Sequence, residues 1–117
     1  MQLLLARIHD SRLAACRDKR MITFIGVGGH AKVCREIEHR YFKTGYIIAV
    51  GNNYDRKLEA ERHNVRFATL IHPSAIISPL AFILYGSVIM AGAVVQAGAI
   101  IRRHCIVNTG ATVDHDC

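Results

Sequence analysis

The chain has 117 residues, of which 51% are hydrophobic and 21% are charged, a composition typical of a folded protein with one ordinary domain or two small ones. Its net charge of +6 suggests an acidic partner, but residues 1–20 carry +3 of this excess and the remainder lacks the basic stripe of a nucleic-acid-binding surface. We find no export signal, no apolar run long enough to span a membrane and no cysteine pair with metal-finger spacing, so we expect a reduced, cytoplasmic protein without a metal site.

The first 20 residues give no clear structural signal. A short run of leucines is interrupted by Arg7 and is followed by a mixed basic segment without a cap or turn. We interpret residues 1–20 as an extension of uncertain structure.

The first clear element is a strand over 22–25, followed by a glycine-rich turn and a helix that we expect to continue to about residue 40. Glycines let a ligand approach the backbone, and the first turn of a helix presents free N–H groups to an anion, so this arrangement suits a phosphate. Gly26, Gly28 and Ala31 also match a loose dinucleotide fingerprint. The acidic residue expected about twenty positions later is absent, which disfavours a nicotinamide cofactor and leaves an adenine dinucleotide as a weaker alternative.

A second strand over 46–50 leads to a Gly-Asn-Asn turn and to a helix over 55–62 that Asn52 or Asn53 can cap. Because the carboxyl ends of parallel strands share one edge of a sheet, both turns should lie at one ligand-binding edge. Arg56 is well placed for a phosphate there, although an exposed arginine on a helix is more often merely solvated.

After a further expected strand over 65–70, one pattern with a period of six continues from Ile71 to Cys117. Stacked short parallel strands joined by tight turns explain this period, whereas a helix or a plain alternating strand does not, so we predict a parallel β-helix. Glycines recur just before the small residue, where a tight corner favours positive φ. The aliphatic column is Ile71, Ile77, Ile83, Ile89, Val95, Ile101, Val107 and Val113; the small column is Ala75, Ala81, Ser87, Ala93, Ala99, Cys105, Ala111 and Cys117; the glycines are Gly86, Gly92, Gly98 and Gly110.

The pleat points both of these columns inward and the residues between them outward. The outward residues are also apolar, which argues for subunit contacts. A zinc site formed by His104, Cys105, His115 and Cys117 is a sharper alternative, but both cysteines should point into the core, and His72 should be structural. The outward residues are Ile76, Phe82, Val88, Val94, Ile100 and Ile106.

Four segments together match one known family. They are residues 25–33 (IGVGGHAKV), 51–53 (GNN) with Arg56, 68–75 (ATLIHPSA) and 108–117 (NTGATVDHDC). On these residues the chain resembles the NeuD/PglD family of sugar O- and N-acyltransferases. The resemblance implies an α/β plus β fold: a shortened Rossmann-like nucleotide-sugar-binding domain over 21–70 and a partial hexapeptide-repeat left-handed β-helix over 71–117.

The resemblance also assigns site residues. It implies that His115 is the general base that takes a proton from the sugar amine or hydroxyl, and that Asp116 orients its ring, roles that suit an imidazole paired with a carboxylate. Acetyl-CoA as acyl donor would bind near Asn108, between neighbouring subunits of a homotrimer. The nucleotide-sugar loops would comprise Gly28, Gly29, His30, Gly51, Asn52, Asn53 and Arg56.

Two departures from the family bear on activity. The family usually has another strand with acidic residues before the Gly-Asn-Asn turn, and the chain stops at Cys117, so we expect a C-terminally truncated family member. The leading hypothesis is acetyl transfer from acetyl-CoA to a nucleotide-activated amino sugar or a sialic acid. The rival hypothesis is an inactive remnant that binds a nucleotide sugar or self-associates.

Overall fold

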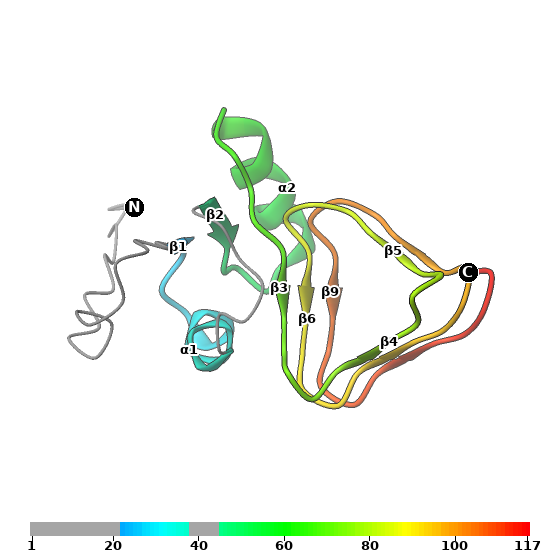
Figure 1. Ribbon diagram of the computed structural model, residues 1–117. Coiled ribbons are helices and arrows are strands. Elements are labelled where there is room, and N and C mark those ends of the chain that lie inside the picture. The colour runs from blue at the N-terminus through cyan, green and yellow to red at the C-terminus, as the bar shows by residue number, and fades with distance from the viewer. Residues whose placement is uncertain (1–21, 38–44) are drawn as a thin grey trace, which may run out of the picture.

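The computed structural model describes residues 22–37 and 45–117, which form a small α/β unit packed on one side of a β-helix (Figure 1). The α/β unit runs β1 (Ile22–Ile25), α1 (Gly29–Glu36), β2 (Gly45–Ile48) and α2 (Asn53–Arg62). β1 and β2 pair in parallel. The extension predicted for residues 1–20 lies outside the described residues, as does the expected end of the first helix near residue 40.

The strand predicted over 65–70 is wrong in extent. Only Phe67 forms a parallel bridge, to Tyr46, and the flanking hydrogen bonds join Tyr46 N to Arg66 O at 3.0 Å and Ala68 N to Tyr46 O at 2.9 Å. Leu70 already belongs to the β-helix. The chain therefore touches the edge of β2 for one residue and then leaves it to enter the first coil.

From Leu70 onward, two-residue parallel strands stack in three columns. Their order is β3-β6-β9 on one face, β4-β7-β10 on the second and β5-β8 on the third, and paired residues lie one coil apart, as Ile76 pairs with Val94. Figure 1 shows these coils as a triangular prism. The predicted combination of a small parallel α/β unit and a left-handed parallel β-helix is confirmed. The strands are β3 (Leu70–Ile71), β4 (Ile76–Ile77), β5 (Phe82–Ile83), β6 (Val88–Ile89), β7 (Val94–Val95), β8 (Ile100–Ile101), β9 (Ile106–Val107) and β10 (Thr112–Val113).

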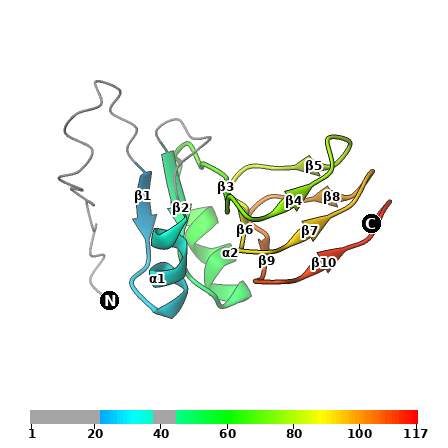
Figure 2. The same ribbon diagram turned by 60° about the horizontal axis from the view of Figure 1, so that its bottom comes forward.

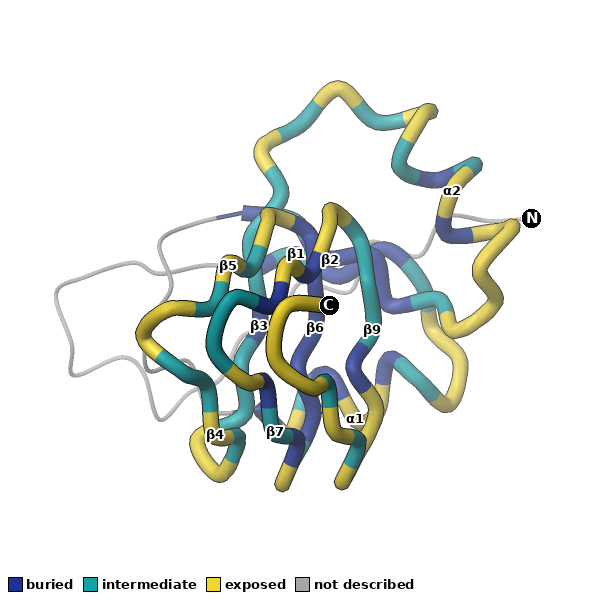
Figure 3. Tube along the Cα trace, turned by 90° about the vertical axis from the view of Figure 1, so that its right-hand side faces the viewer, coloured by how far each residue is buried: buried dark blue, intermediate teal, exposed yellow. Residues whose placement is uncertain are grey.

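The interior of the β-helix contains the aliphatic and small columns, as the pattern predicts. Ile89, Ala93, Val95 and Ala99 form its fully buried centre, and the other inward side chains pack around them. Cys117 differs from the other members of these columns, because it is exposed at the end of the described coil. Figure 3 shows this change from a buried centre to an exposed last turn.

The outward apolar residues differ in exposure from face to face. Val88 is completely buried, because the face formed by β3, β6 and β9 packs on the α/β unit, where Leu70 and Val88 join one core with Phe24 and Ile47. Ile76, Phe82 and Ile100 on the other two faces stay exposed, at 67%, 64% and 51%. Docking of the α/β unit thus covers one face and leaves apolar surface on the others.

The corners of the β-helix confirm the glycine prediction. Gly86, Gly92, Gly98 and Gly110 have φ between 67° and 77°, in the left-handed region that glycine tolerates best. His104 and Asp116 occupy the same six-residue phase with φ of 58°, and each side chain folds back over a glycine of the preceding coil. A Cβ on Gly86 would overlap His104 Nδ1, and one on Gly98 would overlap Asp116 Oδ1.

None of the helices in the described ranges is long and apolar enough to cross a membrane. In Figure 2 the α/β unit lies on one side of the β-helix and the end of the chain on the opposite side. These opposite positions govern how the candidate site residues can cooperate.

Candidate functional site

The first predicted loop joins β1 to α1 and is open to solvent. Gly28 precedes the helix and its carbonyl accepts from Ala31 N at 3.0 Å, but no side chain caps the helix. A Cβ on Gly28 or Gly29 would meet nothing within 4 Å. The first turn of α1 therefore offers uncapped N–H groups and a positive dipole end to an anion.

The second predicted loop lies directly beside the first. A Cβ on Gly51 would stand 3.6 Å from the His30 side chain, and Gly26 leaves no room for a side chain because a Cβ there would lie 2.8 Å from Ala49 O. Asn52, and not Asn53, caps α2, and its Oδ1 accepts from Tyr54 N at 2.9 Å and from Asp55 N at 3.1 Å. The two glycine-bearing loops thus come together, as the parallel-strand prediction requires.

His30 lies where these loops meet. Its Nε2 is buried and has no hydrogen-bond partner among the described residues. Burial, and secondly the positive charge of Arg56, hold the pKa of His30 below its ordinary value, so the ring is neutral at pH 7. A neutral imidazole with an unused nitrogen can donate to or accept from a hydroxyl or phosphate group of a ligand.

Arg56 lies elsewhere than the sequence led us to expect. It is only 2% exposed, and its guanidinium binds main-chain oxygens of Ile48, Val50 and His104. β2 ends at Ile48, two residues before the predicted end, where its partner β1 ends at Ile25. Its placement does not support direct phosphate binding by Arg56.

The predicted catalytic pair lies at an exposed corner after β10. His115 Nδ1 is 2.9 Å from Asp116 Oδ2, and the two side chains are 71% and 79% exposed. The main-chain N–H of His115 donates to Asp114 Oδ1 at 2.8 Å, which fixes the corner. An ionised Asp116 accepts from Nδ1–H, and this leaves Nε2 as the basic nitrogen, directed away from the carboxylate.

The loops and the catalytic pair are not brought together within one copy. The loops belong to the α/β unit, which covers the β3-β6-β9 face, whereas His115 lies two residues before the end of the chain, at the opposite corner of the prism (Figures 1 and 2). Asn108 is exposed at the turn before β10, where its carbonyl accepts from Ala111 N at 3.0 Å. A single small substrate cannot contact both sets in one copy.

The remaining polar residues of the junction and corners have structural partners. His72 Nδ1 bonds Ser74 N at 3.0 Å and Ser74 Oγ at 2.8 Å, and Ser74 Oγ accepts from Gly92 N. Within residues 22–37 and 45–117, no group of three metal-ligating side chains comes together. His72 therefore organises a corner between coils.

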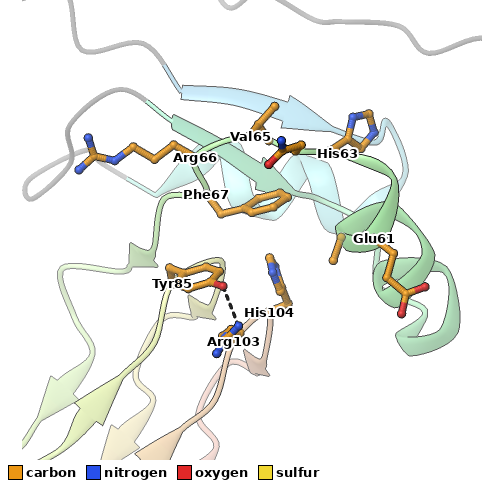
Figure 4. A pocket seen from close by; sticks show the side chains of 10 residues that line it. Glu61, His63, Val65, Arg66, Phe67, Tyr85, Arg103 and His104 are labelled. Carbon is orange, nitrogen blue, oxygen red and sulfur yellow. Dashed lines mark hydrogen bonds between the residues drawn. The ribbon is translucent and has the colours of Figure 1, made fainter.

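A pocket of about 630 Å³ that sequence reasoning missed lies between the end of α2, the loop over 63–67 and a β-helix corner (Figure 4). The His104 ring stands edge-on to Phe67, with centroids 4.6 Å apart, and edge-on to Tyr85, while Arg103 Nη1 donates to Tyr85 Oη at 2.9 Å. Burial, then Arg56 and Arg103, lower the pKa of His104. The predicted catalytic, substrate-binding and acetyl-CoA-binding residues do not line this pocket; His104, considered for the zinc alternative, does.

Comparison with known proteins links the chain to sugar N-acetyltransferases, although no protein-family model matches it. It is 48% identical over 76 residues to UDP-N-acetylbacillosamine N-acetyltransferase of Bacillus subtilis, covering 59% of this chain and 35% of that protein. The acetyltransferase domain of PglB from Neisseria gonorrhoeae, in complex with acetyl coenzyme A, superposes with a TM-score of 0.73 and 35% identity, over 82% of this chain and 65% of that one.

PerB from Caulobacter crescentus, in complex with CoA and GDP-perosamine, is also similar, with a TM-score of 0.69 and 29% identity over 82% of this chain and 63% of that one. The chain thus spans about a third of the curated relative and under two thirds of each solved structure. Over the part that it spans, the chain is similar to sugar acetyltransferases, which confirms the family resemblance indicated by its sequence.

Proposed function

We propose that the chain takes part in the transfer of an acetyl group from acetyl-CoA to the amino group of a nucleotide-linked sugar. The observation that carries the proposal is the hydrogen-bonded His115–Asp116 pair at an exposed corner of the β-helix. In this proposal residues 21–70 form the unit that holds the nucleotide sugar, and residues 71–117 form the unit that holds the acyl donor. The activity of the curated relative and the ligands of the two solved structures support it.

The chemistry assigned to His115 is general base catalysis. As the sugar amine forms its new bond to the acetyl carbon, Nε2 takes the proton that the amine loses. The carbon–sulfur bond of the thioester then breaks. Nε2 returns the proton to the departing sulfur, and coenzyme A leaves as the free thiol. Asp116 keeps Nδ1 protonated and stabilises the imidazolium that forms. Acetyl-CoA supplies the activated acyl group, and the exposed Asn108 with the open corner at Gly110 fits a donor lying along this edge.

The loops of the α/β unit suit the nucleotide part of the acceptor. The uncapped N-terminus of α1 and the nearby start of α2 favour a diphosphate, and the neutral His30 can hydrogen-bond it. Gly28, Gly29 and Gly51 keep the backbone accessible, while Asn52 shapes the second loop as the helix cap. Asn53 lies beside it as the first residue of α2.

Because one copy separates these loops from His115, the proposal includes a homotrimer in which neighbouring copies complete each site. The exposed Ile76, Phe82 and Ile100 provide apolar surface for such contacts. Light scattering after size-exclusion chromatography measures the assembly. A trimer supports this part of the proposal, and a stable monomer with full activity contradicts it.

The activity test combines acetyl-CoA with UDP- and GDP-linked amino sugars and follows release of the free thiol. We expect His115→Ala to lower kcat by about 10² to 10⁴, the usual contribution of a general base, and His30→Ala mainly to raise KM. His63→Ala is the matched control, since His63 pairs with Glu59 at 3.1 Å on α2. Unchanged kcat in His115→Ala would refute the assigned base.

A second candidate is binding of a nucleotide sugar without turnover. The separation of the loops from His115 favours it for an isolated copy. Measurable binding with no thiol release from any amino-sugar nucleotide would support it. Sialic acid as acceptor in the same assay tests the hydroxyl version of the reaction, and fractionation of expressing cells tests the cytoplasmic location that the reaction requires.

A further inference from the structure

Arg56 is an arginine on a polar helix that nevertheless lies almost fully buried between the two halves of the molecule. On the α/β side, its Nη1 donates to Ile48 O and to Val50 O, the latter at 3.0 Å. On the β-helix side, Nε and Nη2 both donate to His104 O, at 3.1 and 2.9 Å. One guanidinium therefore joins the segment that leads into the second loop to a corner of the β-helix.

The corner is itself fixed in place. His104 holds φ of 58°, and its ring lies over Gly86 and against Phe67. A strained backbone of this kind persists only when its surroundings hold it there. The carbonyl offered to Arg56 is thus a rigid anchor, and the planar fork of an arginine matches such fixed acceptors better than a lysine does.

The charge of Arg56 has no carboxylate partner among the described residues, since none of their ion pairs includes it. Main-chain carbonyl dipoles alone compensate it, and a buried charge without a counter-ion projects its field further than a solvated one. That field reaches the loops, because Arg56 is one cause of the lowered pKa of His30. Arg56 Nη1 also donates to Val50 O, the residue before Gly51, so its charge lies directly beside the second loop.

We propose that Arg56 is a positioning residue of the nucleotide site, which fixes the turn over 49–52 against the β-helix and attracts the ligand's phosphates without touching them. The proposal rests on the proposed function in assigning a nucleotide to the loops. The sequence suggested that Arg56 contacts a phosphate directly. In this proposal Arg56 acts instead through Gly51 and the start of α2. Two separable properties follow: hydrogen bonds that shape the turn, and charge that favours an anion.

The test compares Arg56→Lys and Arg56→Met with Lys57→Met, all in the full chain. Lys57 is the neighbouring cation and is 73% exposed, so it controls for loss of a surface charge from the same helix. Isothermal titration with UDP and with GDP, at about 50 mM and about 500 mM NaCl, gives Kd and its salt dependence. Proton NMR titration of His30 reports the field of Arg56 without any ligand.

We expect Arg56→Met to raise Kd by about tenfold or more with a weaker salt dependence, Arg56→Lys to lie between it and the wild type, and Lys57→Met to stay within about twofold. The pKa of His30 should rise in Arg56→Met and change less in Arg56→Lys. A purely structural role would not move the salt dependence or be rescued by lysine.

A folded Arg56→Met that binds UDP like the wild type, or a Lys57→Met that weakens binding equally, overturns the inference. If Arg56→Met does not fold, Arg56→Lys decides: a raised Kd with a weaker salt dependence supports the inference, whereas an unchanged Kd, or a raised Kd with the wild-type salt dependence, overturns it. Absence of UDP and GDP binding by the wild type overturns the proposed nucleotide site and this inference together, whereas binding that is insensitive to Arg56 overturns the inference alone.

Discussion

Replacing Gly86 with alanine probes how firmly the junction holds the ring of His104. Gly86 is a corner residue with φ of 77°, and a Cβ there would overlap Nδ1 of that ring. The ring cannot swing aside freely, because Phe67 and Tyr85 stand edge-on to it, with centroids 4.6 and 5.7 Å away. The substitution therefore combines backbone strain with a steric conflict.

Gly110→Ala is the matched control. Gly110 has a similar φ of 68°, but a Cβ there would meet nothing within 4 Å, so this variant carries only the left-handed strain of about 1–2 kcal/mol. Overpacking adds about 1–3 kcal/mol in Gly86→Ala, for a total of about 2–5 kcal/mol. The difference between the two variants isolates the contact with His104.

Urea unfolding followed by circular dichroism at 25 °C measures both free energies of unfolding. We expect Gly86→Ala to lose about 1–3 kcal/mol more than Gly110→Ala, with a midpoint shift and little change in slope. Measured against His104→Gly alone, the added Gly86→Ala substitution should lose no more than Gly110→Ala does in the wild type. Equal losses in the two alanine variants would refute the packing of the ring over Gly86.

Three further predictions follow from the site. Gly98→Ala should displace the carboxylate of Asp116 and lower kcat of acetyl transfer by about tenfold or more, measured by thiol release, whereas an unchanged kcat would show that the carboxylate does not orient the base. Burial depresses the pKa of His30 and of His104, so the unfolded state binds more protons than the folded state once the pH falls below the ordinary histidine pKa of about 6.5. The free energy of unfolding should therefore fall as the pH drops from about 7 to 5, by at most about 1.4 kcal/mol per pH unit for each histidine. Urea titrations that give a constant free energy of unfolding over this range would contradict the prediction. Asn52→Ala should lower the free energy of unfolding by about 0.5–2 kcal/mol through loss of the helix cap, whereas Asn52→Asp should keep most of the stabilisation that the cap provides. Equal unfolding midpoints for the two variants would argue against the cap.

The β-helix was predictable because its signal is carried by every sixth residue. Inward positions such as Ile89 and Ala93 tolerate only one kind of side chain, so the interior is recorded directly in the sequence. His104 and Asp116 occupy the same six-residue phase as the corner glycines and also have positive φ, so their place in the repeat is a sequence signal for this backbone conformation.

Contacts between distant segments were not predictable in this way. Arg56 lies on a helix of polar residues, so the sequence predicts that it is solvated. Its burial depends on a hydrogen bond to the carbonyl of His104, which is 48 residues later in the chain. Val88 and Phe82 are both apolar outward residues, but one is buried and the other exposed because the α/β unit docks on a single face. The site was predictable as two loops and one corner, but their separation required the three-dimensional arrangement.

Paired residues of neighbouring coils lie 18 positions apart, as Ile76 and Val94 do, which is three hexads per turn of the prism. A gain or loss of a whole turn would lengthen or shorten the molecule while returning every later side chain to the edge it occupied. A single inserted hexad would keep the core apolar yet carry His115 around to a different edge. In related proteins that use this histidine, we therefore expect insertions and deletions in the β-helix to comprise complete turns of 18 residues.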